Sequence, residues 1–434
     1  MTVFVLLALA SAVVTFGLSI VVYRLALKYG LHPKIRDRDV HTRPTPRLGG
    51  VAMFLGIVAA FGLAWLVSSQ FPLLRIVFIN PEQILAILGA ALLIVLIGIA
   101  DDIWDLDWMT KLAGQFIAAG LIAWKGVQLY ALPIGGLSAV GSSLMSVVIT
   151  VFAIVLVMNA INFIDGLDGL VAGVSLIANG VFFLYTYLLV QQTSPTNFFN
   201  LASLIAAILV GACLGFLPIN WHPAKMFMGD AGALLVGLLM ATSAIAVTGD
   251  TDPAAAEGLA QGGSQLLPLF LPIILPFAVL VIPLLDFGMA IVRRLRAGKS
   301  PFSADRKHLH HRLLDMGHSH LHAVLIFYGW TTVASVSCLL YFVLPTYFGL
   351  PTWGATIFLV VGFFTCAIFT LAPLSRRKAI EAASQSTDAH SPDAPEIAAL
   401  DPLDEASESV IDLDDDGIPD GYDIAAKLEP RRHP

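Results

Sequence analysis

Long apolar runs separated by short polar loops dominate the chain. A run of about 17 to 25 apolar residues can cross a bilayer as a helix, and the runs lack the ten-residue alternation typical of barrel strands. We therefore predict an all-α polytopic membrane protein with about eleven transmembrane helices. The predicted spans are 2–27, 51–67, 84–100, 112–124, 144–158, 170–190, 201–217, 233–247, 266–292, 323–344 and 353–371.

The ninth predicted span, 266–292, is long and carries three prolines: Pro272, Pro276 and Pro283. Proline removes a backbone donor, so we expect a kinked or broken ninth helix. Asp286 lies within its last two turns, where an ion pair with a following arginine near the interface is the preferred interpretation.

Composition supports a membrane protein. The chain is 57% hydrophobic and 13% charged, whereas soluble domains average about 25% charged residues. Cys213, Cys338 and Cys366 lie inside apolar runs without CxxC spacing, so they are predicted to be core residues rather than a disulfide or metal site. No nucleic-acid partner is expected.

Basic residues predict the topology because they fall in loops on one side under alternation. These residues are Lys34, Arg36, Arg38, Arg43 and Arg47 in the first loop, Arg293, Arg294, Arg296, Lys299, Arg306, Lys307 and Arg312 before the tenth span, and Arg376, Arg377 and Lys378 after the last. The other side offers little beyond Arg75 and Lys125. The positive-inside rule then predicts an outside N-terminus and a cytoplasmic C-terminus.

The composition changes after Lys378. Residues 1–378 are predicted to form a transmembrane catalytic domain, and 379–434 an acidic disordered cytoplasmic tail rich in Ala, Ser, Asp, Glu and Pro. One stretch of the tail, 412–420, resembles a DxDxDG calcium loop. Because the predicted topology leaves it in the cytoplasm, where calcium is scarce, a plain acidic tail is preferred.

An acidic pair ends the run 84–100. Asp101 and Asp102 are costly to keep near lipid, which indicates function. Asp105 would share their face if the helix continued. A solvated loop, in which aspartates favour turns, is the alternative.

Two more polar clusters follow the fifth and seventh spans. Asn159, Asn162, Asp165 and Asp168 recur every three residues, which places neighbours on one helical face and is more regular than an ordinary helix terminus. Asp230 begins the eighth span, where it could simply cap the helix. Beside the other acidic residues, metal coordination is the preferred interpretation.

Basic and aromatic residues complete the set. His308, His310 and His311 lie between Lys307 and Arg312, which favours an anion site over zinc, with a headgroup-binding loop as the alternative. Arg47 precedes two glycines whose amides can face phosphate, and Phe227 precedes the eighth span. Carboxylates for Mg²⁺ and cations for phosphate together predict phosphoryl transfer from a soluble donor to a molecule in the bilayer.

These motifs, in this order, resemble those of the polyprenyl-phosphate N-acetylhexosamine-1-phosphate transferases. The motifs are Asp101-Asp102, Asn159-x-x-Asn162-x-x-Asp165-Gly-Leu-Asp168, Phe227-x-Gly-Asp230 and His308-x-His310-His311, within 24–373. The resemblance implies transfer of a sugar 1-phosphate from a UDP-N-acetylhexosamine to undecaprenyl phosphate, with release of UMP and with Mg²⁺ or Mn²⁺. It also implies a site on the cytoplasmic face of a bacterial inner membrane; a homodimer remains open.

The resemblance implies a role for each motif residue. Asp230 and Asn162 would bind the metal, and Asp101, Asp102 and Asp165 would be catalytic. The implied substrate-binding residues are Arg47, Asn159, Asp168, Asn220, Phe227, His308, His310 and His311. Among these, Phe227 would stack on uracil, with Asn220 and Asp168 as its hydrogen-bonding neighbours. Direct attack by the lipid phosphate is favoured over a phospho-aspartate intermediate.

The first loop ends Pro-Arg-Leu-Gly-Gly, unlike the Thr-Met-Gly-Gly of the muramoyl-pentapeptide branch. It is similar to the branch that initiates O-antigen, enterobacterial common antigen, teichoic acid or arabinogalactan linkage, which implies UDP-N-acetylglucosamine as donor. Another UDP-N-acetylhexosamine or UDP-muramoyl-pentapeptide is the alternative. A membrane transporter is a remote alternative, since its ionisable residues would lie near the bilayer midplane, and a CDP-alcohol phosphotransferase would need an Asp-Gly-x-x-Ala-Arg run that the chain lacks.

Overall fold

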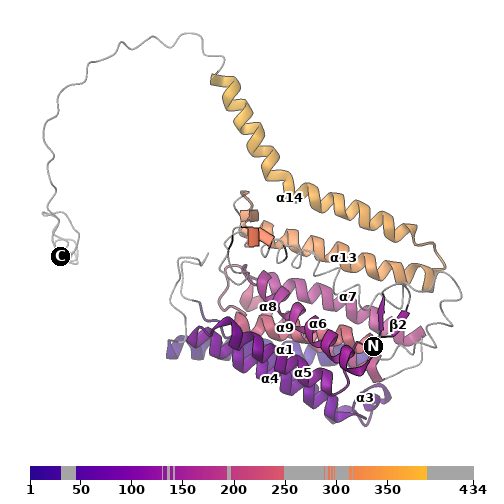
Figure 1. Ribbon diagram of the computed structural model, residues 1–434. Helices are drawn as coiled ribbons and strands as arrows, with labels where there is room; N and C mark the ends of the chain where they lie inside the picture. The colour runs from indigo at the N-terminus through magenta and orange to yellow at the C-terminus, as the bar shows by residue number, and fades with distance from the viewer. Residues whose placement is uncertain are drawn as a thin grey trace, which may run out of the picture. The chain divides into compact units, whose positions relative to one another are not determined.

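In the part of the chain that it describes, the computed structural model is helical apart from one pair of short strands (Figure 1). It describes residues 1–30, 45–129, 131–133, 137–139, 142–192, 197–248, 312–314 and 316–388, with isolated positions between 288 and 298. The helices are α1 Thr2–Tyr29, α2 Gly49–Val67, α3 Pro72–Val77, α4 Pro81–Trp104, α5 Trp108–Trp124, α6 Ser143–Ile164, α7 Leu170–Gln192, α8 Asn197–Asn220, α9 Gly229–Thr248, α13 His320–Phe348 and α14 Trp353–Asp388. Strands β1 Ala131–Pro133 and β2 Leu137–Ala139 pair antiparallel.

Nine helices within the described ranges are long and apolar enough to cross a membrane: α1, α2, α4, α6, α7, α8, α9, α13 and α14. This confirms the prediction of an all-α polytopic membrane protein. Helix α5, with 17 residues, covers the short run predicted at 112–124. The predicted ninth span, 266–292, with Asp286, falls outside the described residues except at isolated positions, so the total of eleven and the orientation stay predictions.

Capping residues at the loop boundaries determine where several helices begin and end. The Asp107 side chain accepts a hydrogen bond from the Thr110 N–H at 3.0 Å and starts α5. Ser142 caps α6 in the same way through the Met145 N–H at 3.2 Å. Gly349 ends α13 in the left-handed conformation, which glycine adopts without steric cost.

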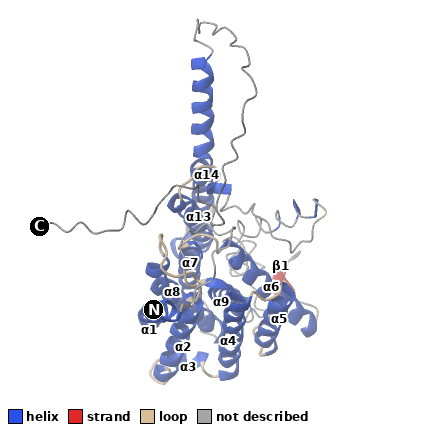
Figure 2. Ribbon diagram, turned by 90° about the vertical axis from the view of Figure 1, so that its left-hand side faces the viewer, coloured by secondary structure: helices blue, strands red, loops and turns tan. Residues whose placement is uncertain are grey.

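Helix α9 is almost entirely buried and packs against α2, α4, α6, α7 and α8 (Figures 1 and 2). Glycines allow the closest of these contacts. A Cβ on Gly50 of α2 would overlap the Gly232 backbone, and a Cβ on Gly98 of α4 would overlap Ala231. Small residues let backbones approach in membrane helices, where packing replaces the hydrophobic driving force. These contacts bring the start of α9 against the end of α4.

The chain divides into two compact units, Met1–Lys378 and Ala379–Pro434. Helix α14 continues to Asp388, so 379–388 are helical, whereas the sequence predicted disorder from 379 onward; 389–434 lie outside the described residues. All three cysteines are described and none forms a disulfide.

Candidate active site

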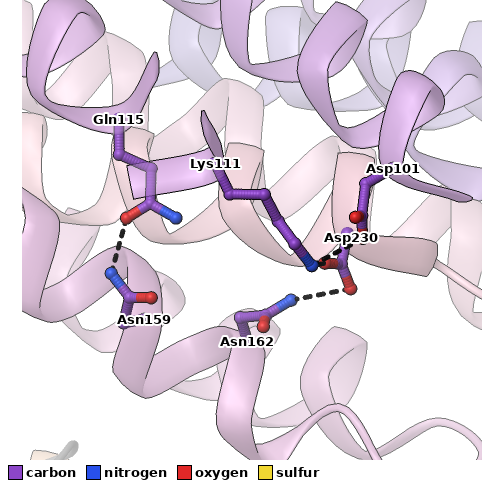
Figure 3. A network of polar contacts seen from close by, with 6 residues as sticks. All are labelled: Asp101, Lys111, Gln115, Asn159, Asn162 and Asp230. Atoms are coloured by element: carbon purple, nitrogen blue, oxygen red, sulfur yellow. Dashed lines mark hydrogen bonds and ion pairs between the residues drawn. The ribbon is translucent and has the colours of Figure 1, made fainter. Parts of the chain in front are cut away.

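Two carboxylates from distant parts of the chain meet at one lysine (Figure 3). Asp101 lies in the last turn of α4 and Asp230 in the first turn of α9. The Lys111 ammonium of α5 lies 2.6 Å from Asp101 Oδ2 and 2.9 Å from Asp230 Oδ2. One cation therefore bridges both carboxylates, and it offsets the unfavourable position of Asp101 at the negative end of the α4 dipole.

Lys111 was missed by the sequence analysis, although a signal for it exists. The Asp107 cap starts α5, so Lys111 falls at the end of the first helical turn, directly before the apolar run. A basic residue at the edge of a membrane helix, close in sequence to an acidic pair, indicates an ion pair with a functional role.

A second set of polar contacts joins α6 to α9 and to α5 (Figure 3). Asn162 Nδ2 donates to Asp230 Oδ1 at 3.2 Å, so the amide predicted as a second metal ligand touches the predicted metal aspartate. Asn159, one turn earlier, donates to Gln115 Oε1 at 2.5 Å. Gln115 is buried one turn beyond Lys111. The two asparagines thus have different partners: Asn162 belongs to the acidic cluster and Asn159 to the α5–α6 contact.

Asp102 points at the start of α9. A Cβ on Gly229 would lie 2.6 Å from Asp102 Oδ2 and would overlap the Arg47 carbonyl oxygen, and Gly229 has φ +70°. Asp102 Oδ2 and Asp101 Oδ1 are buried without a hydrogen-bond partner among the described residues. Buried carboxylate oxygens need a compensating donor or cation, so this donor set fits a hard divalent ion such as Mg²⁺.

Asp105 does not join the cluster, and the expectation that the helix would carry it there is wrong. Helix α4 ends at Trp104, and Asp105 adopts a left-handed conformation with φ 56°. Its N–H donates to the Asp101 carbonyl at 2.8 Å and its side chain is exposed. The residue therefore terminates the helix instead of extending its acidic face.

Asp165 follows the last residue of α6 and is half-buried. Burial, together with the negative charge of Asp230, raises the pKa of Asp165 to about 7, and the nearby Arg47 guanidinium opposes this rise. The carboxyl group is consequently poised to exchange a proton near neutral pH.

Backbone pairing holds the Arg47 segment against the Phe227 segment. The Phe227 N–H donates to the Pro46 carbonyl at 2.8 Å, and the Gly49 N–H donates to the Phe227 carbonyl at 3.0 Å. The half-exposed Phe227 ring is thereby anchored beside the start of α2. Two loops predicted to bind substrate from sequence thus lie side by side next to Asp102 and Gly229.

Asp168 and Asn220 form a second cluster. The buried Asp168 Oδ2 accepts hydrogen bonds from His222 Nδ1 at 2.7 Å and the Ala224 N–H at 3.1 Å. Asn220 Oδ1 accepts from the Gly169 N–H at 3.0 Å, and its Nδ2 donates to the Met226 carbonyl at 3.0 Å. In the structure both predicted uracil-binding side chains tie the loop after α6 to the loop before α9.

The ligand atoms of Asp168, His222 and His320 lie within 4.8 Å of one another, a spacing that admits a metal ion. Hydrogen bonds also link these residues to one another. An ionised carboxylate only accepts, so His222 Nδ1 is the donor to Asp168. His320 Nε2 faces the Asp168 N–H at 3.4 Å, and the two rings stack with centroids 4.3 Å apart. In the structure the three residues thus form one hydrogen-bonded cluster. The predicted anion-binding residues His308, His310 and His311 lie outside the described residues.

Similarity to known proteins extends over most of the chain. The family described as Glycosyl transferase family 4 matches residues 84–248. The chain is 39% identical to a decaprenyl-phosphate N-acetylglucosaminephosphotransferase of Mycolicibacterium smegmatis over 86% of this chain and 89% of the relative. It is 42% identical to the Mycobacterium tuberculosis protein of the same name, over 76% of this chain and 80% of the relative. An undecaprenyl-phosphate alpha-N-acetylglucosaminyl 1-phosphate transferase of Escherichia coli is 28% identical over 79% of this chain and 84% of the relative.

Proposed function

Since the chain belongs to glycosyl transferase family 4, we propose that it transfers N-acetylglucosamine 1-phosphate from UDP-N-acetylglucosamine to a polyprenyl phosphate. Its enzyme class is that of an N-acetylglucosamine phosphotransferase, as its relatives' names indicate. The observation that carries the proposal is the meeting of Asp101, Asp230 and Asn162 around Lys111, at the ends of membrane helices. Such a site can face a lipid phosphate and a water-soluble donor at once.

Two acceptors follow from the relatives' names. The relatives with 39–42% identity are named for decaprenyl phosphate, and a 28% relative for undecaprenyl phosphate. We propose decaprenyl phosphate as the preferred acceptor, with undecaprenyl phosphate, the expectation from sequence, as the second candidate. The two acceptors differ by one isoprene unit far from the phosphate. Assaying UMP release with each acceptor side by side tests which one the protein prefers.

Mg²⁺ is the cation proposed for the site. Asp102 and Asp230 would hold it, assisted by Asp101, because the orphaned buried oxygens of Asp101 and Asp102 need a cation and Asp230 lies beside them. When bound, Mg²⁺ would neutralise charge on the donor diphosphate. Lys111 keeps Asp101 and Asp230 in place, and Asn162 fixes the second oxygen of Asp230.

The proposed reaction is one displacement. An oxygen of the lipid phosphate bonds to the donor β-phosphorus, the bond from that phosphorus to the bridging oxygen breaks, and UMP leaves with the bridging oxygen. Such a transfer depends on positioning and charge neutralisation more than on a nucleophilic side chain. Asp165, with its pKa near neutrality, is the group suited to accept a proton from the lipid phosphate.

The site is proposed to face the cytoplasm of a bacterium, at its inner membrane. Support comes from the basic loops, which the positive-inside rule places there, and from Arg47, which lies in the first of these loops and beside the acidic cluster. Labelling of single cysteines introduced at exposed loop positions, in intact cells and in inverted vesicles, tests this orientation.

The direct test is UMP release by the purified protein. We expect release only with UDP-N-acetylglucosamine, polyprenyl phosphate and Mg²⁺ together, and its loss in Asp230→Asn. Glu82→Gln is the matched control, since it removes a carboxylate from the opposite end of α4, where Glu82 pairs with Lys125 at 2.6 Å. UMP release without lipid acceptor would indicate a hydrolase. Uptake of UDP-sugar into sealed vesicles without UMP formation would indicate a transporter.

A further inference from the structure

Three of the four backbone polar groups of Asp168 and Gly169 contact side chains of other helices. The Asp168 N–H faces His320 Nε2 at 3.4 Å, and the Gly169 N–H donates to Asn220 Oδ1 at 3.0 Å. The Gly169 carbonyl accepts from Tyr328 Oη at 2.6 Å. Helix α13 supplies two of these three contacts, although it lies more than a hundred residues away in sequence.

The Tyr328 phenol ring packs in the space left by the missing side chain of Gly173. A Cβ on Gly173, in the first turn of α7, would overlap the phenol ring, and Gly169 itself has φ +74°. A larger residue at Gly173 would displace the ring, and a non-glycine at Gly169 would strain the turn that presents the carbonyl. The short bond from Tyr328 thus depends on both glycines.

The loop that Tyr328 holds joins the two clusters of the site. Asp165 at its start interacts electrostatically with Asp230, and Asp168 near its end bonds His222. Through Asn220, which also bonds the Met226 carbonyl, the loop is tied to the segment that carries Phe227. A shift of Gly169 would therefore move the aspartates of the loop and the Phe227 segment relative to the acidic cluster.

We propose that Tyr328 is a positioning residue for the nucleotide-sugar donor: its hydroxyl, bonded to the Gly169 carbonyl, fixes the Asp165–Gly169 loop in the conformation that binds a nucleoside diphosphate sugar. His320 supports the same loop one peptide earlier. The inference rests on the proposed function, because the donor is the substrate of that reaction. Neither residue touches the reacting groups, so the predicted effect is on donor binding.

The test compares two tyrosines on the same helix. Tyr328→Phe deletes the hydroxyl that reaches Gly169. Tyr347→Phe deletes a hydroxyl that donates to the Leu188 carbonyl of α7 at 2.9 Å. This bond lies near the C-terminal end of α7, away from the Asp165–Gly169 loop. With UMP release as the assay, we expect Tyr328→Phe to raise the KM for UDP-N-acetylglucosamine about fivefold to tenfold, the effect of one lost hydrogen bond. Its kcat and its acceptor KM should stay within about twofold, and Tyr347→Phe should leave all three within about twofold.

The competing explanation is that both tyrosines only stabilise the packing of α13 against α7 and have no role in donor binding. Equal effects of the two variants on thermal unfolding and on activity would establish that explanation and overturn the proposal, as would an unchanged donor KM in Tyr328→Phe. If the wild-type protein itself released no UMP, the proposed function would fail instead, so the two failures are distinguishable.

A second pair keeps the proposal testable if Tyr328→Phe does not fold. His320→Leu removes the acceptor that faces the Asp168 N–H, whereas His318→Leu removes a ring nitrogen that contacts the Thr370 carbonyl of α14 at 3.0 Å. We expect the donor KM to rise about threefold or more in His320→Leu only. Equal donor KM values in the two histidine variants would contradict the positioning role of α13.

Discussion

Substitution of Gly229 by alanine tests whether the start of α9 is built around Asp102. Gly229 has φ +70°, a conformation that costs an L-residue about 1–2 kcal/mol. Its new Cβ would overlap the Arg47 carbonyl and lie 2.6 Å from Asp102 Oδ2, where ordinary contact begins at 3.4 Å. The carboxylate must therefore retreat by the difference, 3.4 − 2.6 = 0.8 Å, or α9 must move away from it.

The size of that movement sets the expected loss of activity. Catalytic groups must be held within about 0.5 Å of their productive positions, and a misplacement of about 1 Å can cost about 100-fold in rate. We expect kcat for UMP release to fall about 100-fold in Gly229→Ala, with a loss of stability of about 1–3 kcal/mol from the strained backbone.

The measurement is the initial rate of UMP release at saturating donor and acceptor, with thermal unfolding in detergent as a check on folding. Gly62→Ala on α2 is the matched control, since nothing lies within 4 Å of its added Cβ, and it should keep full activity. A folded Gly229→Ala protein with kcat within about threefold of wild type would refute the reasoning that Asp102 and the start of α9 are in functional contact.

Substitutions at four other positions address the charges and the ring of the site. Asp230→Asn keeps the shape but removes a charge, so UMP release should fall at least about 1,000-fold; near-normal Mg²⁺-dependent turnover would remove Asp230 from the site. Lys111→Met should lose activity about 100-fold or more because two carboxylates then face each other, while Lys111→Arg keeps measurable turnover; equal rates for both would contradict the bridging role. Phe227→Ala should raise the donor KM about tenfold with a smaller change in kcat, and an unchanged donor affinity would argue against stacking. The raised pKa of Asp165, about 7, means that its contribution to stability is fully present below its ordinary pKa and is lost as pH rises through about 7. Without divalent cations, Asp165→Asn should therefore show a smaller fall in melting temperature between about pH 5 and pH 7.5 than wild type, and identical falls would show that Asp165 does not titrate there.

The class of fold and the acidic side chains of the candidate site could be predicted from local sequence patterns. Apolar runs long enough to cross a bilayer leave few alternatives to helices, because unpaired backbone groups are too costly in lipid. Carboxylates next to such runs, at Asp101, Asp102 and Asp230, indicate function for the same reason. Both inferences depend on local pattern alone.

The contact partners of these side chains depend on how the helices pack. Lys111 lies between Asp101 and Asp230, and Tyr328 reaches Gly169, only because helices far apart in sequence pack through glycine contacts such as Gly98 against α9. A local pattern specifies which side chains are charged, whereas the distance between two charges depends on how the helices cross. For the same reason Asp105, three residues beyond Asp102, lies outside the cluster: the backbone turns left-handed there and ends the helix, which fixes the side chain in solvent.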